Sequence, residues 1–141
     1  MTASSKKTGI LKVIFDSNAF FVPLEFKIDI FEELCRLLNR NVEFILLSPV
    51  KRELELLAGG DSPKSRREAL FALEFAGKCK YVAVETDGKA LVDDVIVRVA
   101  KSWNSPVFTN DRQLKKRLRD ISVPVIYVRQ KSRLDIDGLI S

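Results

Sequence analysis

Residues 10–18 read ILKVIFDSN, a short and mainly apolar run that ends in three polar residues. A run of this kind predicts a β-strand that is buried on both faces. Similar runs recur along the chain, at 42–47 (VEFILL), 81–84 (YVAV), 106–109 (PVFT) and 124–128 (PVIYV). None of them alternates strictly between apolar and polar residues, which indicates a parallel sheet with both faces covered.

Segments with helical features lie between these runs. Residues 26–39 and 90–103 carry apolar side chains at helical spacing. The pairs Ser48-Pro49 and Ser62-Pro63 indicate helix starts with serine as the N-cap, and a short basic helix is expected after 110–111. The alternation of strands and helices predicts a three-layer α/β/α sandwich around a central parallel sheet of about five strands.

The length of 141 residues favours one domain, expected at 10–128 between a flexible N-terminal tail (1–9) and a C-terminal tail (129–141). The composition, 46% hydrophobic and 30% charged, is typical of globular proteins. No apolar run is long enough for a membrane span or a signal peptide, so a cytoplasmic location without membrane association is expected. Cys35 and Cys79 are far apart and lie among apolar residues, so both are expected to be buried structural thiols.

The chain contains no histidine. This excludes a Ser-His-Asp triad, a Cys-His pair, an HExxH zinc site and any imidazole acid or base. An enzyme with this composition must use carboxylates, lysines, hydroxyls or thiols, with or without a metal ion.

Acidic residues occur near the ends of four successive expected strands: Asp16, Glu53, the pair Asp93 and Asp94, and Asp111. Parallel strands end at one edge of a sheet, so these acids are expected to gather there. Like charges repel, and a divalent cation is the simplest way to neutralise them. Mg²⁺ and Mn²⁺ prefer oxygen ligands, and such a site can hydrolyse a phosphodiester without histidine.

Each acid also has a simpler interpretation. Asp16 or Asp111 alone could cap a helix, and Glu53 alone could be solvated surface. On a helical wheel Asp93 falls on the flank of the apolar stripe, where a ligand in a cleft is expected. Asp94 falls on the outer face, where it could form an ordinary pair with Arg98, although a kinked first turn could bring in both aspartates.

Four ordered segments resemble the motifs of PIN-domain nucleases: VIFDSNAF, LSPVKRELELL, LVDDVIVRVA and PVFTNDRQLKKRLR. VPVIYV is similar to the last strand of that family, so the resemblance runs from about Val13 to Val128. It is closest to the ribosomal-RNA-processing branch, and toxin members are similar in length. The resemblance implies a metal-dependent ribonuclease whose acidic site is Asp16, Glu53, one or both of the pair at 93–94, and Asp111.

In this interpretation Asp16, Asp93, Asp94 and Asp111 are the candidate ligands of one or two Mg²⁺ or Mn²⁺ ions, and Glu53 completes the site or orients the attacking water. Supporting roles are expected for four neighbours: Ser17 and Asn18 around Asp16, and Thr109 and Asn110 around Asp111. A plain helix cap is the alternative for Asn18.

The net charge of +5 already includes these acids, so the rest of the surface is more basic than the total. Lys51 and Arg52 flank Glu53, and the densest basic group follows Asp111: Arg112, Lys115, Lys116, Arg117 and Arg119. Further basic residues are Lys64, Arg66, Arg67, Arg129, Lys131 and Arg133. Basic groups around an acidic site fit an RNA backbone, although each one alone could be simply solvated. No aromatic RNA-recognition motif is visible.

The first hypothesis is therefore hydrolysis of RNA phosphodiester bonds in RNA processing. One alternative is an RNA-binding assembly module with little catalysis, and another is a ribonuclease toxin with an antitoxin partner. Besides RNA, the candidate partners are a second copy of the chain, an antitoxin and a ribosome-assembly factor.

Overall fold

The computed structural model describes residues 9–140, so the expected N-terminal tail lies almost entirely outside the described residues. The strands form one six-stranded sheet in the order β3-β2-β1-β4-β5-β6. Their bounds are β1 Leu11–Phe15, β2 Val42–Leu47, β3 Lys80–Val82, β4 Val107–Phe108, β5 Val125–Arg129 and β6 Arg133–Asp137. The first five strands are parallel, as expected, and β6 pairs antiparallel with β5.

The strand order places a switch point between β1 and β4. Moving along the chain from β1, the sheet grows through β2 to β3 on one side and then through β4 to β5 on the other. Strands β1 and β4 are direct neighbours, with Ile14 opposite Val107 and Phe15 opposite Phe108. In open parallel sheets a crevice forms beyond the carboxyl ends of the strands at such a point.

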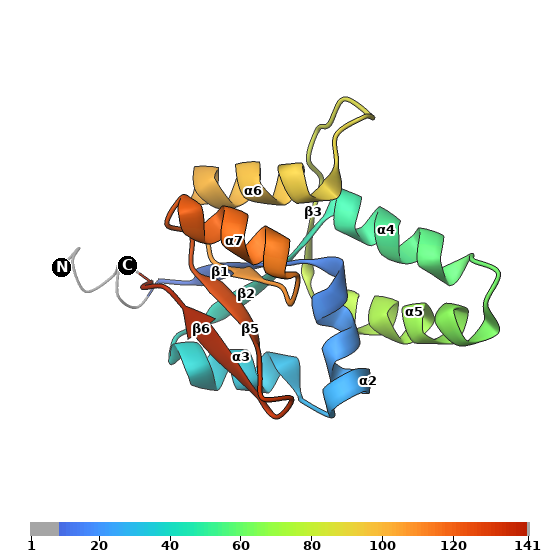
Figure 1. Ribbon diagram of the computed structural model, residues 1–141, viewed down its shortest axis with the longest axis horizontal. Helices are drawn as coiled ribbons and strands as arrows, with labels where there is room; N and C mark the ends of the chain where they lie inside the picture. The colour runs from blue at the N-terminus through green and yellow to red at the C-terminus, as the bar shows by residue number, and fades with distance from the viewer. Residues whose placement is uncertain (1–8, 141) are drawn as a thin grey trace.

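Helices complete the three layers (Figure 1). The helical bounds are η1 Ser17–Phe21, α2 Val22–Phe26, α3 Ile30–Leu38, α4 Ser48–Ala58, α5 Pro63–Ala76, α6 Val92–Trp103 and α7 Arg112–Asp120. Helices α6 and α7 lie on one face of the sheet and α3 on the other, while α4 and α5 pack against each other beside the carboxyl end of β1 (Figure 1). The expected α/β sandwich is confirmed.

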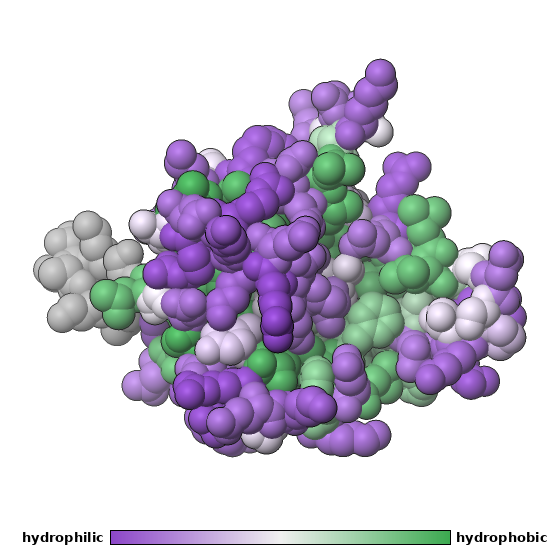
Figure 2. Space-filling view, viewed as in Figure 1, coloured by the Kyte–Doolittle hydropathy of each residue, from purple (hydrophilic) through white to green (hydrophobic). Residues whose placement is uncertain are grey.

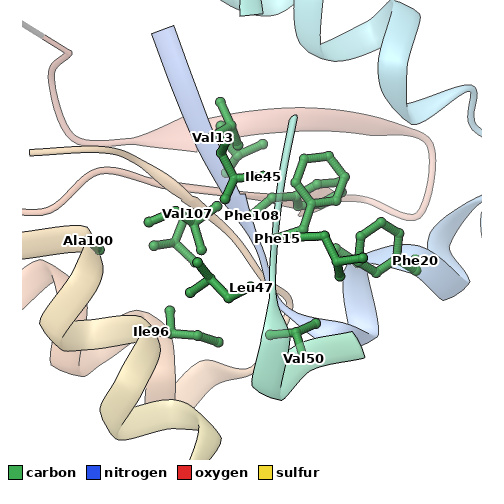
Figure 3. Close-up of a cluster of buried hydrophobic side chains, with 14 of the residues drawn as sticks. Val13, Phe15, Phe20, Ile45, Leu47, Val50, Ile96, Ala100, Val107 and Phe108 are labelled. Atoms are coloured by element: carbon green, nitrogen blue, oxygen red, sulfur yellow. The ribbon is translucent and has the colours of Figure 1, made fainter. Parts of the chain in front are cut away.

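The core explains why the strand runs are apolar throughout. Val13, Ile14 and Phe15 are consecutive residues of β1, and all three are fully buried, because both faces of the sheet are covered. The ring of Phe15 lies 5.0 Å from that of Phe20 and 5.3 Å from that of Phe108, and Figure 3 shows these side chains with neighbours from β2, α4 and α6. Burial of one such side chain contributes about 1.5–3 kcal/mol.

Two helix predictions differ from the structure. The helix expected at 26–39 begins only at Ile30, as α3, because α2 ends at Phe26 and Lys27 after it adopts a left-handed conformation (φ 59°). Ser48 is the first residue of α4 and not its N-cap; its hydroxyl accepts a hydrogen bond from the backbone N–H of Val84 at 3.0 Å. Ser62, by contrast, caps α5 as predicted by accepting from the N–H of Ser65 at 3.3 Å.

The sheet continues beyond the expected domain end at 128. Residues 133–137 form β6, which contributes the buried Leu134 to the core and covers the edge of β5. The segment that was expected to be a tail therefore supplies a strand.

Neither cysteine is a fully buried thiol. Cys35 is exposed, contrary to expectation, and Cys79 is half-buried, with burial raising the pKa of its thiol to about 12. Among residues 9–140, no helix is both long and apolar enough to span a membrane.

Candidate active site

Four of the predicted acids face the switch point from four different elements. Asp16 follows β1 directly, and Asp111 follows β4 as the N-cap of α7. Glu53 lies in the second turn of α4 and Asp93 in the first turn of α6. Asp16 is buried, with 4% of its surface exposed, and the other three are half-buried.

Asp16 is held by three hydrogen bonds. Its Oδ2 accepts from the hydroxyl of Thr109 at 2.7 Å and from the side-chain amide of Asn18 at 3.2 Å. Its Oδ1 accepts from the backbone N–H of Ser17 at 2.8 Å, so Ser17 holds Asp16 through its main chain. Asp16 itself is the N-cap of η1, which excludes the alternative that Asn18 is the cap of that helix.

The acids interact electrostatically. Burial raises the pKa of Asp16 to about 6; the bonds from Thr109 and Ser17 lower it, while the negative charges of Asp93 and Glu53 raise it further. The pKa of Asp93 is also raised, first by burial and then by the charges of Asp111 and Glu53. The charges of Glu53 and Asp93 thus act on Asp16, and those of Asp111 and Glu53 act on Asp93.

The residues around the acids connect three strands. The backbone N–H of Asn110 donates to Oδ1 of Asn18 at 3.0 Å, and the N–H of Asp111 donates to the hydroxyl of Thr109 at 3.1 Å. Oδ1 of Asn110 accepts from the N–H of Val128 in β5 at 2.8 Å. Thr109 thus supports the carboxylate of Asp16 and the backbone of Asp111, whereas Asn110 contacts Asn18 of η1 and Val128 of β5.

The two aspartates at 93 and 94 have different surroundings. Asp93 interacts with the other acids, whereas Oδ1 of Asp94 lies 2.9 Å from a guanidinium nitrogen of Arg117 in α7. The alternative that Asp94 pairs with Arg98 does not match the structure, because Asp94 pairs with Arg117 and Arg98 donates to the backbone carbonyl of Glu85 at 3.1 Å. Asp111 has the expected capping role, since its Oδ1 accepts from the N–H groups of Gln113 and Leu114 at 2.9 and 3.2 Å.

The donor set suits a hard cation in its chemistry. All four groups offer carboxylate oxygens, which Mg²⁺ and Mn²⁺ prefer. Burial and the neighbouring acids raise the pKa of Asp16 and of Asp93, so a bound cation would stabilise their charged forms. Within residues 9–140, however, no three acidic side chains lie together as a preformed metal centre.

Residues 13–131 match the family described as "PIN like domain". The chain belongs to this family. The chain is also similar to the ribonuclease VapC4 of Methanocaldococcus jannaschii, with 33% identity over 130 residues that cover 92% of this chain and 98% of the relative. The ribonuclease VapC9 of Archaeoglobus fulgidus is 29% identical over 96 residues, or 68% of each chain.

Two solved structures are similar in fold. The PIN domain endonuclease Utp24 matches with a TM-score of 0.75 and 27% identity, covering 92% of this chain and 93% of that one. The VapBC2 complex of Rickettsia felis, bound to a promoter DNA fragment, matches with a TM-score of 0.58 and covers 84% of this chain and 100% of that one. At 15% identity the second match shows the fold alone.

The basic residues of this PIN-like domain are divided among several places. Arg117 lies beside the acids through its pair with Asp94, and the ammonium group of Lys51 lies 5.0 Å from the ring centre of Tyr81. Arg119 forms an ion pair with Asp137 at 3.3 Å, near the amino end of β5 and so away from the acids. Lys116 and Arg52 are exposed, and Arg52 lines a cavity beside Glu53.

A larger cavity of about 800 Å³ adjoins the acids on the other side, between α2 and the β5–β6 hairpin. We call it the hairpin groove and define it by its lining residues: Asn18, Phe21, Glu25, Phe26, Thr109, Asn110, Arg112, Lys115, Tyr127, Val128, Gln130 and Lys131. Sequence reasoning placed Lys131 among the basic residues, but it gave no role to the rings of Phe21, Phe26 and Tyr127. No local motif brings these rings together, because they come from η1, α2 and β5.

Figure 2 shows hydrophilic side chains over most of this face, above α6, α7 and the β5–β6 hairpin. Hydrophobic side chains collect beside them, toward α4 and α5 (Figure 2).

Proposed function

We propose that the chain is a metal-dependent ribonuclease that hydrolyses RNA phosphodiester bonds and acts in RNA processing. The observation that carries the proposal is the group of four acids, from four elements, around the buried Asp16 at the switch point. Such a group is costly to a fold unless it serves to bind something positive. The relatives named ribonuclease or endonuclease at 33% and 27% identity support an RNA substrate and hydrolysis.

Asp16, Asp93 and Asp111 would hold one or two Mg²⁺ or Mn²⁺ ions, and Glu53 would complete the site or orient the attacking water; Asp94 remains a weaker candidate ligand. The bound metal would supply an activated water and stabilise negative charge on the phosphate oxygens. Thr109 and Asn18 position Asp16 by hydrogen bonds to its Oδ2. Positioning of this kind from outside the ligand set is common in metal sites.

The test is cleavage of labelled single-stranded RNA with Mn²⁺ by the wild type, by Asp16→Asn and by the control Glu74→Gln, which changes an exposed acid in α5. Cleavage should disappear in Asp16→Asn and persist in Glu74→Gln. Equal rates in the wild type and Asp16→Asn would overturn the assignment.

Two alternatives have distinct signatures. An RNA-binding assembly module would bind RNA equally well after chelation and in Asp111→Asn, and it would not cleave. A toxin would arrest growth on expression and be neutralised by an antitoxin; the VapC name of two relatives favours a test of this role. Growth arrest that depends on Asp16 would move the role from RNA processing to a toxin while leaving the chemistry unchanged.

A further inference from the structure

The hairpin groove begins at the acids and leads away from them. Asn18 and Thr109, which hold Asp16, line its inner end. Its walls are η1 with α2 on one side and the turn between β5 and β6 on the other, two segments that lie close together in Figure 1. A ligand in this groove would therefore be continuous with one at the acids.

Two cations line the groove without an ion pair among residues 9–140, and Glu25 is the acidic residue in its lining. Arg112 and Lys131 are exposed, and within the described part of the chain neither forms an ion pair. Lys115 differs, because it lies 3.5 Å from Asp137 and 3.7 Å from the ring centre of Tyr127. The unpaired positive charge of the groove thus lies on Arg112, at the start of α7, and on Lys131, in the β5–β6 turn, and it suits phosphate groups.

Aromatic rings line the same groove. Phe21 and Tyr127 line the groove from η1 and from β5, and both are half-buried. Rings in a basic groove are the usual means of binding unpaired nucleotides, because every base can stack on them whatever the sequence. In a duplex the bases are already stacked and paired, so they cannot reach such rings.

The turn that presents Lys131 has an unfavourable backbone. Gln130 and Lys131 both have positive φ, 54° and 59°, and the N–H of Ser132 donates to the carbonyl of Arg129 at 3.2 Å. This is the geometry of a type I′ turn, in which Asn-Gly is preferred. Residues with longer side chains in this geometry are under strain, and such strain is more often retained where a side chain has a function.

We propose that the hairpin groove binds an unpaired segment of the RNA strand next to the bond to be cleaved. Arg112 and Lys131 contact its phosphates, and Phe21 and Tyr127 contact its bases. This inference rests on the proposed function, since it extends the path of the substrate beyond the acids.

The experiment measures binding of a labelled unpaired RNA by fluorescence anisotropy in EDTA, where no cleavage occurs. Arg112→Gln and Lys131→Gln should each weaken binding about fivefold and reduce the slope of log affinity against log salt concentration by about one. Lys101→Gln, which removes the same charge from the exposed side of α6, is the matched control and should bind like the wild type. Tyr127→Leu should weaken binding without changing the salt slope.

Glycine at each turn position separates charge from conformation. Gln130→Gly should raise the melting temperature and leave RNA binding unchanged, because it relieves strain and keeps Lys131. Lys131→Gly should also raise the melting temperature but weaken binding as much as Lys131→Gln. Weaker binding in Gln130→Gly than in Lys131→Gln would contradict the role given to the lysine charge.

Cleavage with Mn²⁺ is measured in parallel, so that the two proposals fail separately. Wild-type affinity in Arg112→Gln and Lys131→Gln, together with normal cleavage, would overturn the groove and leave the ribonuclease intact. Loss of binding in these variants without any cleavage by the wild type would overturn the ribonuclease and support the groove. Equally tight binding of a duplex RNA would overturn the inference that the segment is unpaired.

Discussion

At the scale of single residues, Asp16 lies at the centre of the acid group and its charge lowers the stability of the folded protein. Its pKa of about 6 exceeds the ordinary 3.8, with burial as the first cause. The folded protein therefore keeps a proton that the unfolded chain releases as the pH rises from 3.8 to about 6. The free energy of unfolding falls over that range, in total by about 3 kcal/mol for this group, and stays lower above it.

We expect Asp16→Asn to stabilise the protein by about 1–2 kcal/mol at pH 7 in EDTA, somewhat less than the full cost because the amide cannot accept every bond of the carboxylate. The measurement is urea unfolding between pH 4 and 8. The stability difference between variant and wild type should grow from pH 4 to pH 6 and then stay constant. A difference that is flat over the whole range would mean that Asp16 titrates normally.

Asp61→Asn, which changes an exposed aspartate before α5, is the control and should show no such growth with pH. Asp93 also has a raised pKa, so part of the pH dependence should remain in Asp16→Asn. The same comparison with Mn²⁺ added should reverse the order of stability if the wild type binds the ion more tightly.

The sequence predicted which residues surround Asp16 better than it predicted their contacts. Four acids at strand ends follow from the strand runs and their polar breaks. The support of Asp16 by Thr109 was not predicted, because these residues are 93 positions apart and meet only through the pairing of β1 with β4. The structure excludes a cap role for Asn18, and Asp111 has both a cap position and a place among the acids.

At the scale of elements, α6 and α7 separate the two adjacent aspartates. The first turn of α6 directs Asp93 toward the acids and Asp94 toward Arg117 of α7. We expect Asp93→Asn to lower the rate of RNA cleavage far more than Asp94→Asn, measured with the same RNA and Mn²⁺. A larger loss in Asp94→Asn would show that the first turn of α6 rearranges when the metal binds.

The pair between Asp94 and Arg117 is half-exposed, so its loss should cost less than about 1 kcal/mol of stability. A double-mutant cycle with Asp94→Asn and Arg117→Gln measures this energy directly. Its unfolding data also show whether Asp94→Asn is folded, which the comparison of cleavage rates with Asp93→Asn requires.

Element boundaries were predictable where local chemistry decides them. Ser62-Pro63 starts α5 and Gly77 follows its end, as the sequence indicated. The break at Lys27 was not predictable, since lysine rarely takes a left-handed conformation and the buried Ile28 after it continues the apolar pattern. Strand β6 reads RLDID, an alternation that suits a strand with one covered face, but no neighbouring signal identified its partner.

At the scale of the whole molecule, β6 closes one side of the sheet. It covers the edge of β5, and its residues also pack near α3. We expect a chain that stops after Arg129 to lose cooperative unfolding and to aggregate, because the edge of β5 and the core beneath Leu134 become exposed. Circular dichroism melts and size-exclusion chromatography measure this.

A chain that stops after Gly138 is the control and should remain cooperative and monodisperse, because it keeps β6 and the buried Leu134 and loses only the exposed Leu139, the partly buried Ile140 and Ser141. A cooperative, monodisperse protein ending at Arg129 would restore the view that the residues after 129 are a tail. RNA binding by that truncated chain would then test the hairpin groove in the absence of Gln130 and Lys131.

Surfaces were the least predictable feature of the molecule. The run of basic residues at 112–119 looks continuous in the sequence, yet Arg112 faces the hairpin groove, Arg117 pairs with Asp94 and Arg119 pairs with Asp137. A helix turns by about 100° per residue, so neighbours in sequence point to different parts of the surface. Which of them meets a partner depends on the tertiary contacts of α7.

The pairing of β1 with β4 also sets when the acids can meet. Asp16 is made early and Asp111 late, and they come together only after β4 inserts beside β1. A growing chain on the ribosome therefore has no assembled acid group until most of its length has emerged. If the chain cleaves RNA, it would not act on its own messenger during most of its synthesis. Cleavage would become possible only after the short strand β4 has paired with β1.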